Sequence, residues 1–580
     1  MLIPLAELNG LDLPGFVAAL DGIYEHSPWV AEAAIDAGPF ASRLDLLDAL
    51  NAAMLAAPRD TQRALICAHP ELAGKAAVAR ELTDASTREQ SGAGLDRCTP
   101  EEYARLHLLN ERYRARFGFP FIIAVKGHSR ATIIAAMAER IDNDEDAEFA
   151  RALHEIGRIA GFRLADRVSE PAGDEIIAMC TRLAWLSEQS HALTCTCMTP
   201  VHQATAALLR DWMLEAGMSA EIDAIGNVVG RWPSIRPGAK TLITGSHYDT
   251  VINGGHYDGR LGVVLPIVAG RRLRQAGVRL PFDVEIVAFS DEEGVRFQST
   301  FLGSSALAGH FDPMLLARRD ADGISLAEAL QQAGHDPAAI PLLARDPATV
   351  AGFVEVHIEQ GPVLLDEGRA LGVVTAINGS ERHLLTIIGL AGHAGTVPMR
   401  LRHDAAAAAA EIVLAVERIA RSRDGVVATV GKLAVPDGAI NVIAGRCELS
   451  IDLRAPSDAL RAAAAAELFA AIDAIAERRS VDISRTAVLA IAATPCDPAM
   501  QAVLAASVGR VAGDSNVRHL PSGAGHDAMM MARLTPVAML FVRCGNGGIS
   551  HNPLETMTAD DAQLAAAAFT DFLQTLPVPP

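Results

Sequence analysis

The sequence lacks any uninterrupted apolar run near the ~20 residues that a membrane-spanning helix needs. Its first residues, MLIPLAELNGLDLPGF, contain no basic stretch followed by an apolar core, so we expect no secretory signal. The eight cysteines are scattered, and none forms a CxxC pair. That usage is typical of free thiols in a reducing compartment and not of a metal or redox site. These absences predict a cytoplasmic protein that does not act at a membrane.

Positive charge is also scarce. Lys and Arg number 50 against 70 Asp and Glu, which gives a formal net charge of -20. Such a surface repels backbone phosphates, so a nucleic-acid-binding role is disfavoured. Hydrophobic residues make up 50% of the 580 positions and charged residues 21%, which is ordinary for globular proteins. A chain of this length predicts several domains.

Residues 1–168 have helical spacing of apolar residues and no long strand-like alternation. The pattern recurs in SRLDLLDALNAAMLAA, EEYARLHLLNERYRARF and AEFARALHEIGRIAGFRLADRV, often just after a Ser, Thr or Asp that would cap a helix. We predict an all-α domain here. The polar stretch SEPAGDE at 169–175 is the best candidate for a linker.

From residue 175 the pattern changes to short β-branched runs that alternate with helical ones, as in KTLITGSHYDT and FDVEIVAFSDEEG. This alternation predicts an α/β domain with a largely parallel sheet, over 175–378 plus 493–580. Residues 379–492 have their own succession of strand, helix, strands, helix and strand. They predict an inserted α+β domain. The fold class is therefore multidomain: all-α, then α/β with an α+β insertion.

Residues able to bind metals follow several of the predicted strands: His247 and Asp249, Asp258, Asp291 to Glu293, His357 and Glu359, and His551. Side chains that follow parallel strands gather at the carboxyl edge of a sheet. Imidazole with carboxylate suits Zn, Mn, Co or Ni, and the absence of a Cys ligand disfavours a structural zinc site. Each motif alone is weak, since a lone His in a loop is usually a hydrogen-bonded residue.

The ordered set GSHxDT, GGxxDGxxG, DEEG, HIEQG and SHNPxE resembles the binuclear metallohydrolases of the aminoacylase and carboxypeptidase-G type. It is most similar to the branch with allantoate amidohydrolase, N-carbamoyl-L-amino-acid hydrolase and β-ureidopropionase. The resemblance covers about 175–580. It implies two divalent metal ions, Mn or Zn, bound by His247, Asp258, Glu293, His357 and His551, with Asp258 between the ions.

The same resemblance assigns other roles. Glu292 would be the general base that takes a proton from the attacking water, and Asp249 would orient the ligand His247. His393 would stabilise the oxyanion, usually from the partner subunit, which implies a homodimer formed through an inserted lid/dimerisation domain. The substrate would be bound by Gln360, Asn441, Arg454, Gly523 and Ala524. His526 receives no role.

In residues 1–168, the segments HPELAGK, STREQSGAGLD and FGFPFI together resemble 2-oxo-4-hydroxy-4-carboxy-5-ureidoimidazoline (OHCU) decarboxylase. This is a small, helical, cofactor-free enzyme of urate breakdown. The resemblance implies that His69 is the acid/base residue, with a pKa near neutrality. Substrate contacts would come from Ser86, Glu89, Gln90, Arg163 and the backbone near Phe119 and Ile122.

The two resemblances together favour a bifunctional enzyme of ureide breakdown. The first part would make (S)-allantoin, and the second would hydrolyse allantoate to ureidoglycine, ammonia and CO2. Motifs shared across the branch leave two alternatives open for the second part, an N-carbamoyl-L-amino-acid hydrolase or a ureidoglycolate hydrolase. The helical part has the alternative of a non-catalytic docking module.

Overall fold

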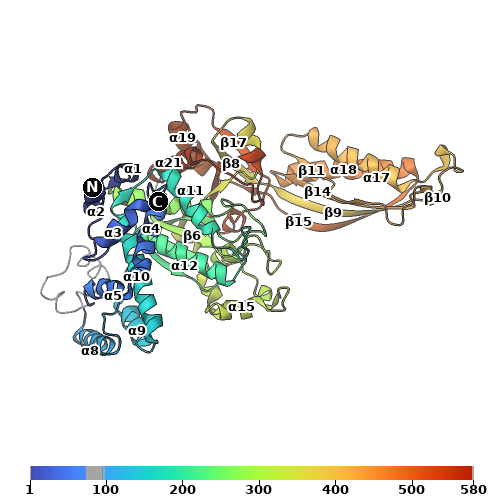
Figure 1. Ribbon diagram of the computed structural model, residues 1–580. Helices are drawn as coiled ribbons and strands as arrows, with labels where there is room; N and C mark the ends of the chain where they lie inside the picture. Colours follow the sequence, from blue (N-terminus) through green and yellow to red (C-terminus); the bar gives the residue numbers. More distant parts are fainter. Residues whose placement is uncertain (1, 73–94, 96–97, 578–580) are drawn as a thin grey trace.

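The computed structural model describes residues 2–72, 95 and 98–577. Figure 1 shows a helical part in blue, a sheet with helices around it, and a long unit in yellow and orange that projects away from both. No described helix combines the length and the hydropathy needed to cross a membrane.

The amino-terminal part is built from helices around one apolar core that includes Phe16, Leu50, Tyr113 and Ile156. Side chains cap several of these helices as the sequence predicts; Ser42 accepts from Asp45 N, and Thr99 forms a capping box with Glu102. The helices are α1 (Leu5–Leu8), α2 (Leu13–Ala19), α3 (Trp29–Ala34), η1 (Ile35–Ala37), α4 (Arg43–Ala56), α5 (Arg59–Ala68), α8 (Pro100–Phe117), α9 (Arg130–Arg140) and α10 (Glu145–Ala165).

One short parallel pairing departs from the all-α prediction. Strand β1 (Ile3–Pro4) pairs with β2 (Val168–Ser169), so the two ends of this part lie side by side. A pair of two-residue strands has too little alternation for sequence periodicity to detect.

The central sheet has strand order β16-β8-β18-β7-β5-β6-β4-β3, with β17 paired to β8. Its middle, β18-β7-β5-β6, is parallel, whereas β8 and β4 join it antiparallel, so the sheet is mixed. The strands are β3 (Ser219–Ile222), β4 (Val228–Trp232), β5 (Thr241–His247), β6 (Asp283–Phe289), β7 (Val350–Ile358), β8 (Leu371–Ile377), β16 (Thr494–Pro495), β17 (Arg518–Ser522) and β18 (Val537–Val542).

Helices cover both faces of this sheet, which explains why its central strands are apolar along their whole length. Alternate residues face opposite cores: Val354 and Val356 pack with one set of helices, and Phe353 packs in the core on the other face. The first set is α11 (Ala172–Ala184), α12 (Pro200–Glu215), α13 (Leu261–Gln275), α19 (Pro498–Ala512) and α21 (Ala559–Thr575). Shorter helices elsewhere are α14 (Leu302–Leu307), η3 (Pro313–Ala317), α15 (Leu326–Gln332), η4 (Pro337–Leu343), η5 (Pro347–Thr349), α16 (Val363–Asp366), α20 (Ala528–Met531) and η7 (Asn546–Gly548).

The chain leaves the central sheet after β8 and returns at β16. Between them, a second sheet has the order β11-β14-β9-β15, with β12 paired to β14. Its strands are β9 (Gly379–Ile388), β11 (Val427–Thr429), β12 (Leu433–Ala434), β14 (Arg446–Ala455) and β15 (Asp482–Ile491). Helices α17 (Ala405–Arg421) and α18 (Asp458–Arg479) pack on one face. On strand β9, Leu385 is buried beneath these helices, whereas Leu384 on the other face is 49% exposed.

At the far end of this projecting unit, β10 (Gly392–His393) pairs with β13 (Val442–Ile443), beside η6 (Met399–Leu401). Figure 1 shows β10 at the tip, well away from the central sheet.

The helical part docks on α11, α12 and α13 through buried ion pairs. Arg43 on α4 lies 3.0 Å from the Glu175 carboxylate and 2.7 Å from that of Glu215, and Arg271 on α13 contacts the same two carboxylates. The predicted linker at 169–175 is therefore wrong. Helix α11 begins at Ala172, and Glu170 is buried where its carboxylate accepts a hydrogen bond from Arg43 N.

Candidate active sites

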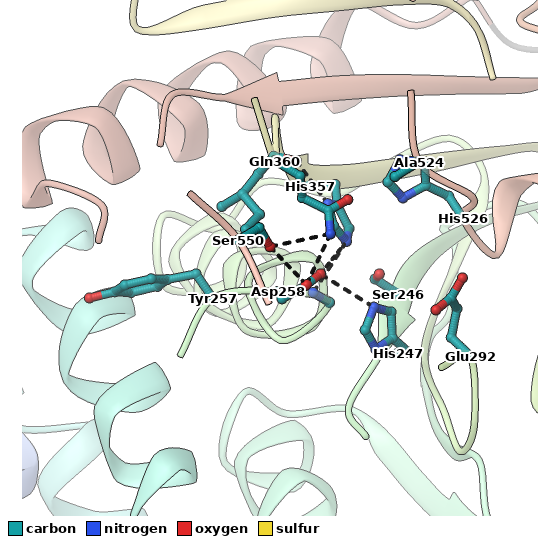
Figure 2. A network of polar contacts seen from close by, with 12 residues as sticks. Ser246, His247, Tyr257, Asp258, Glu292, His357, Gln360, Ala524, His526 and Ser550 are labelled. Carbon is teal, nitrogen blue, oxygen red and sulfur yellow. Dashed lines mark hydrogen bonds and ion pairs between the residues drawn. The ribbon is translucent and has the colours of Figure 1, made fainter. Parts of the chain in front are cut away.

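The candidate metal centre lies at the carboxyl edge of the central sheet. His247 is the last residue of β5, His357 lies near the end of β7, and Glu292 and Glu293 follow β6. Because these three strands are parallel neighbours, their carboxyl ends meet at one edge, as the sequence predicts. Figure 2 shows His247 and His357 on opposite sides of Asp258.

Asp258 is the meeting point of three histidines. Its Oδ1 lies 3.3 Å from His357 Nε2 and 3.7 Å from His247 Nε2, and its Oδ2 lies 3.2 Å from His551 Nε2. Burial would raise the pKa of Asp258, but the close approach of the three histidines outweighs that effect and holds the pKa well below its usual range. The hydrogen bond with Asp258 raises the pKa of His551 to about 9. In this arrangement of a charged carboxylate among three imidazoles, a metal cation can take the place of the protons that the histidines share with Asp258.

Glu293 joins this group from the loop after β6, with its carboxylate 3.5 Å from His551 Nε2. Among the described residues, three overlapping groups of donors lie close enough together here to hold a metal ion: His247, Asp258 and His357; His247, Glu292 and Glu293; and Asp258, Glu293 and His551. Asp258 Oδ1 is buried and has no hydrogen-bond partner in the described residues. Nitrogen and oxygen donors around an unsatisfied carboxylate oxygen fit a divalent metal.

Asp249 fixes the backbone of the acidic loop. Glu292 N donates to its Oδ1 at 3.0 Å, and Glu293 N donates to its Oδ2 at 3.2 Å. The same carboxylate lies 3.3 Å from His247 Nδ1. Glu292 itself is buried, and burial raises the pKa of its carboxyl well above the usual range, with help from Glu293 and Asp527. A buried carboxyl group beside the candidate metal ligands is placed to exchange a proton with a water molecule there.

Gln360 lies beside the candidate metal centre. Its Nε2 donates to Asp258 Oδ2 at 2.9 Å and to Ser550 Oγ at 3.3 Å. Its backbone has φ 55°, a conformation that non-glycine residues rarely adopt. The constrained backbone directs the amide toward the reaction centre.

The loop after β17 also lies near the candidate metal centre, where His526 packs against His357. Ala524 N donates to Ser522 Oγ at 3.2 Å, and Gly523 O accepts a hydrogen bond from Arg454 of the second sheet at 2.6 Å. Arg454 of the second sheet thus lies against the Gly523–Ala524 loop. His526 is fully buried with its ring 4.4 Å from that of His357.

His393 and Asn441 lie elsewhere. His393 belongs to β10 at the tip, and Ala394 N donates to Asn441 O at 2.9 Å. Strand β14 separates this tip from Arg454, because the nine strand residues from Arg446 to Arg454 span about 26 Å. The structure therefore does not bring Asn441 and Arg454 together within one chain, nor His393 to the metal centre.

A second candidate site lies in the helical part. His69 follows α5, is 6% exposed, and its Nε2 has no hydrogen-bond partner in the described residues. Arg163 on α10 forms an ion pair of 2.8 Å with Glu25 and donates to Gly22 O. Burial and the nearby Arg163 lower the pKa of His69 to about 4, so the ring is neutral at pH 7. This pKa lies below the near-neutral value that the resemblance implies, because burial disfavours the charged ring.

Other predicted groups near His69 have different environments. Phe119 is fully buried and packs against Phe117 and Phe149, and Ile122 O accepts a hydrogen bond from Arg140 at 3.0 Å. The carbonyl of Ile122 is thus already bonded. Ser86, Glu89 and Gln90 lie outside the described residues.

Comparison with known proteins agrees with the metal centre. The model of the peptidase family M20/M25/M40 matches residues 243–575, a range that contains all five candidate metal ligands. The chain belongs to this family.

Curated relatives resemble the chain over most of their length. An allantoate deiminase of Arabidopsis thaliana is 41% identical over 69% of this chain and 82% of that protein. An N-carbamoyl-L-amino acid amidohydrolase of Geobacillus stearothermophilus is 38% identical over 70% of this chain and 96% of its own length. Among solved structures, a hydantoinase/carbamoylase family amidase of Burkholderia multivorans matches with a TM-score of 0.66 and 31% identity, over 70% of this chain and 98% of that one.

The helical part has its own match. The OHCU decarboxylase family model covers residues 9–165, which include His69 and Arg163. The chain thus joins an OHCU decarboxylase region to an M20 hydrolase region.

Sequence reasoning missed residues of both candidate sites. Ser550 and Glu555 lie within the GGISHNPLE segment, yet attention to its histidine left them without a role. Glu25 lies in YEHSPW, which carries no metal or catalytic signature, so only its contact with Arg163 reveals it.

Proposed function

We propose that the chain is a bifunctional enzyme of ureide breakdown. The helical part, 1–168, would convert OHCU to (S)-allantoin with loss of CO2. The part formed by 175–378 and 493–580 would hydrolyse allantoate to ureidoglycine, ammonia and CO2. The observation that carries the hydrolase proposal is Asp258, whose carboxylate meets His247, His357 and His551 in an M20 chain with allantoate deiminase relatives.

The hydrolase would depend on two divalent ions, Mn or Zn, held by His247, Asp258, Glu293, His357 and His551. Such ions polarise the carbonyl under attack and make water a better nucleophile. Glu292 would take the proton from the attacking water and deliver it to the leaving nitrogen. Its position is set by Asp249, which accepts its backbone N–H.

Substrate recognition would be divided between the two sheets. Arg454, already hydrogen-bonded to Gly523, would bind the allantoate carboxylate with two parallel bonds, and the backbone at Gly523 and Ala524 would assist. Gln360 would contact the ureido group, since its amide faces Asp258.

His393 and Asn441 would act on the site of a partner subunit. Both lie at the tip of the 379–492 unit, which extends away from its own metal centre. We infer that this unit is a lid/dimerisation domain and that the protein is a homodimer. The exposed apolar residues Leu384 and Ile388 on the uncovered face of its sheet support this inference.

In the decarboxylase, His69 would donate the proton that takes the place of the departing CO2. Its ring is neutral without substrate, and an anionic substrate beside it favours the protonated form. Protonation of the carbanion from one side would give a single stereoisomer. Arg163 would bind a substrate carboxylate, for which it must share its guanidinium with Glu25. This reaction needs no cofactor, and a cytoplasmic location stays a prediction.

A second candidate function for the hydrolase has support of its own. The N-carbamoyl-L-amino acid amidohydrolase of Geobacillus stearothermophilus is nearly as similar as the allantoate deiminase. A ureidoglycolate hydrolase also fits the same residues. The decarboxylase region favours a ureide substrate over an N-carbamoyl amino acid, and the allantoate deiminase relative favours allantoate among the ureides.

The test uses the full chain, depleted of metal with a chelator and then supplied with Mn2+ or Zn2+. We expect ammonia release from allantoate only with metal, and OHCU decarboxylation with or without it. His69→Ala should abolish decarboxylation and spare ammonia release, whereas Glu292→Gln should do the reverse. An unchanged decarboxylation rate in His69→Ala would mean that the helical part is a docking module.

A further inference from the structure

Glu555 is a buried carboxylate in the SHNPLE segment for which the proposed function has no role. It is 4% exposed. Its Oε1 accepts hydrogen bonds from Tyr257 N at 2.8 Å and from Asp258 N at 3.2 Å. Its Oε2 accepts from Ser550 Oγ at 3.0 Å. All of these partners lie on the two segments that carry Asp258 and His551.

These contacts join parts of the chain that are nearly 300 residues apart, since Glu555 and Tyr257 are separated by 298 positions. Ser550 extends the connection, because its hydroxyl also lies 3.0 Å from Asp258 Oδ2. The side chain is closely confined. A Cβ placed on Gly255 would lie 2.1 Å from the Glu555 carboxyl carbon, so a glycine at 255 leaves room for this carboxylate.

We propose that Glu555 is a positioning residue that fixes the position of Asp258 relative to His551. It fixes the main chain of Asp258 directly and orients the hydroxyl of Ser550, which precedes His551. The proposal rests on the metal-dependent function given above. Outer residues of this kind are commonly worth ~10–100-fold in metal affinity.

The contacts predict that metal affinity depends more on the length and hydrogen-bonding groups of the side chain at position 555 than on its charge. A glutamine at 555 can still accept from the two backbone N–H groups and can donate to Ser550 Oγ. An aspartate keeps the charge but is one methylene too short to reach both segments. A simple electrostatic attraction of cations would give the opposite ranking, so the two substitutions separate the two explanations.

The experiment measures Mn2+ and Zn2+ affinity by chelator competition in full-length wild type, Glu555→Gln, Glu555→Asp and Glu555→Ala. Glu285→Ala is the control, since Glu285 is another buried carboxylate, paired with Arg231 and Arg345 toward the opposite end of β6. Thermal denaturation and kcat and KM for allantoate are recorded for each protein.

We expect Glu555→Gln to bind metal within about threefold of wild type, and the Asp and Ala variants to bind ~10–100-fold more weakly. Saturating metal should restore much of their kcat. If the Ala variant fails to fold, the metal affinities of the Gln and Asp variants still distinguish positioning from electrostatic attraction. Unchanged affinity in the Asp and Ala variants, or loss in Gln with retention in Asp, overturns the positioning role. Absence of metal binding by wild type overturns the proposed hydrolase as well.

Discussion

Glu292 and Asp249 are joined by a hydrogen bond of 3.0 Å from the Glu292 N–H to Asp249 Oδ1. The second oxygen of Asp249 accepts Glu293 N, and His247 Nδ1 lies 3.3 Å away. One carboxylate therefore sets the position of the proposed base and of two proposed metal ligands.

Asp249→Asn should disturb all three at once. The asparagine has a single acceptor oxygen, and its NH2 group would face a backbone N–H instead of accepting from it. We expect metal affinity to fall ~10–100-fold and kcat for allantoate to fall with it. Metal titration and steady-state kinetics measure these effects. The matched control is Asp346→Asn, an exposed helix cap, where no change is expected. Wild-type metal affinity in Asp249→Asn would contradict this account.

The placement of His393 predicts complementation between subunits. Glu292→Gln and His393→Ala should each be inactive toward allantoate. In a mixed dimer, one site has an intact Glu292 and receives an intact His393 from the other chain. Random mixing by co-refolding or co-expression should therefore restore about a quarter of the wild-type activity in a homodimer.

Two controls accompany the mixture. Each inactive variant alone sets the background, and sedimentation measures the oligomeric state. If the mixture stays at the background rate although mixed dimers form, His393 does not act across the subunit boundary.

Glu170 predicts how stability depends on pH. Burial, together with the nearby Glu175, raises the pKa of its carboxyl to about 7 from a usual value near 4.5. The folded protein therefore binds this proton more tightly than the unfolded chain does. The contribution of Glu170 to stability is present in full below pH 4.5 and is lost as pH rises through 7.

Glu170→Gln should remove this dependence, since glutamine stays neutral and can still accept from Arg43 N. At pH 8 the variant should be more stable than wild type by about 1–3 kcal/mol, and at pH 4.5 the two should agree. Urea denaturation across this range measures the difference. Parallel pH profiles of the two proteins would show that the raised pKa is wrong.

Much of the fold follows from local patterns in the sequence. The strands that end at His247, Phe289 and Ile358 are buried on both faces, so they read as continuous β-branched runs. Helices such as α4 and α8 carry explicit caps. By contrast, β1 and β2 are two residues each, and their pairing depends on tertiary contact alone.

The incorrect prediction of a linker at 169–175 has a similar cause, because the burial of its polar residues depends on tertiary contacts. Glu170 and Glu175 resemble solvent-exposed groups in the sequence, yet their partner Arg43 is more than 120 positions away. Long-range pairing of this kind has no local signal. The separation of Asn441 from Arg454 is also invisible in sequence, because strand length and sheet direction decide it.

The most direct test of the account compares kcat/KM of the metal-loaded full chain for allantoate, N-carbamoyl-L-amino acids and ureidoglycolate, with ammonia release as the readout. The account predicts that allantoate has the highest kcat/KM of the three. A kcat/KM for an N-carbamoyl-L-amino acid that exceeds the allantoate value by orders of magnitude would contradict it.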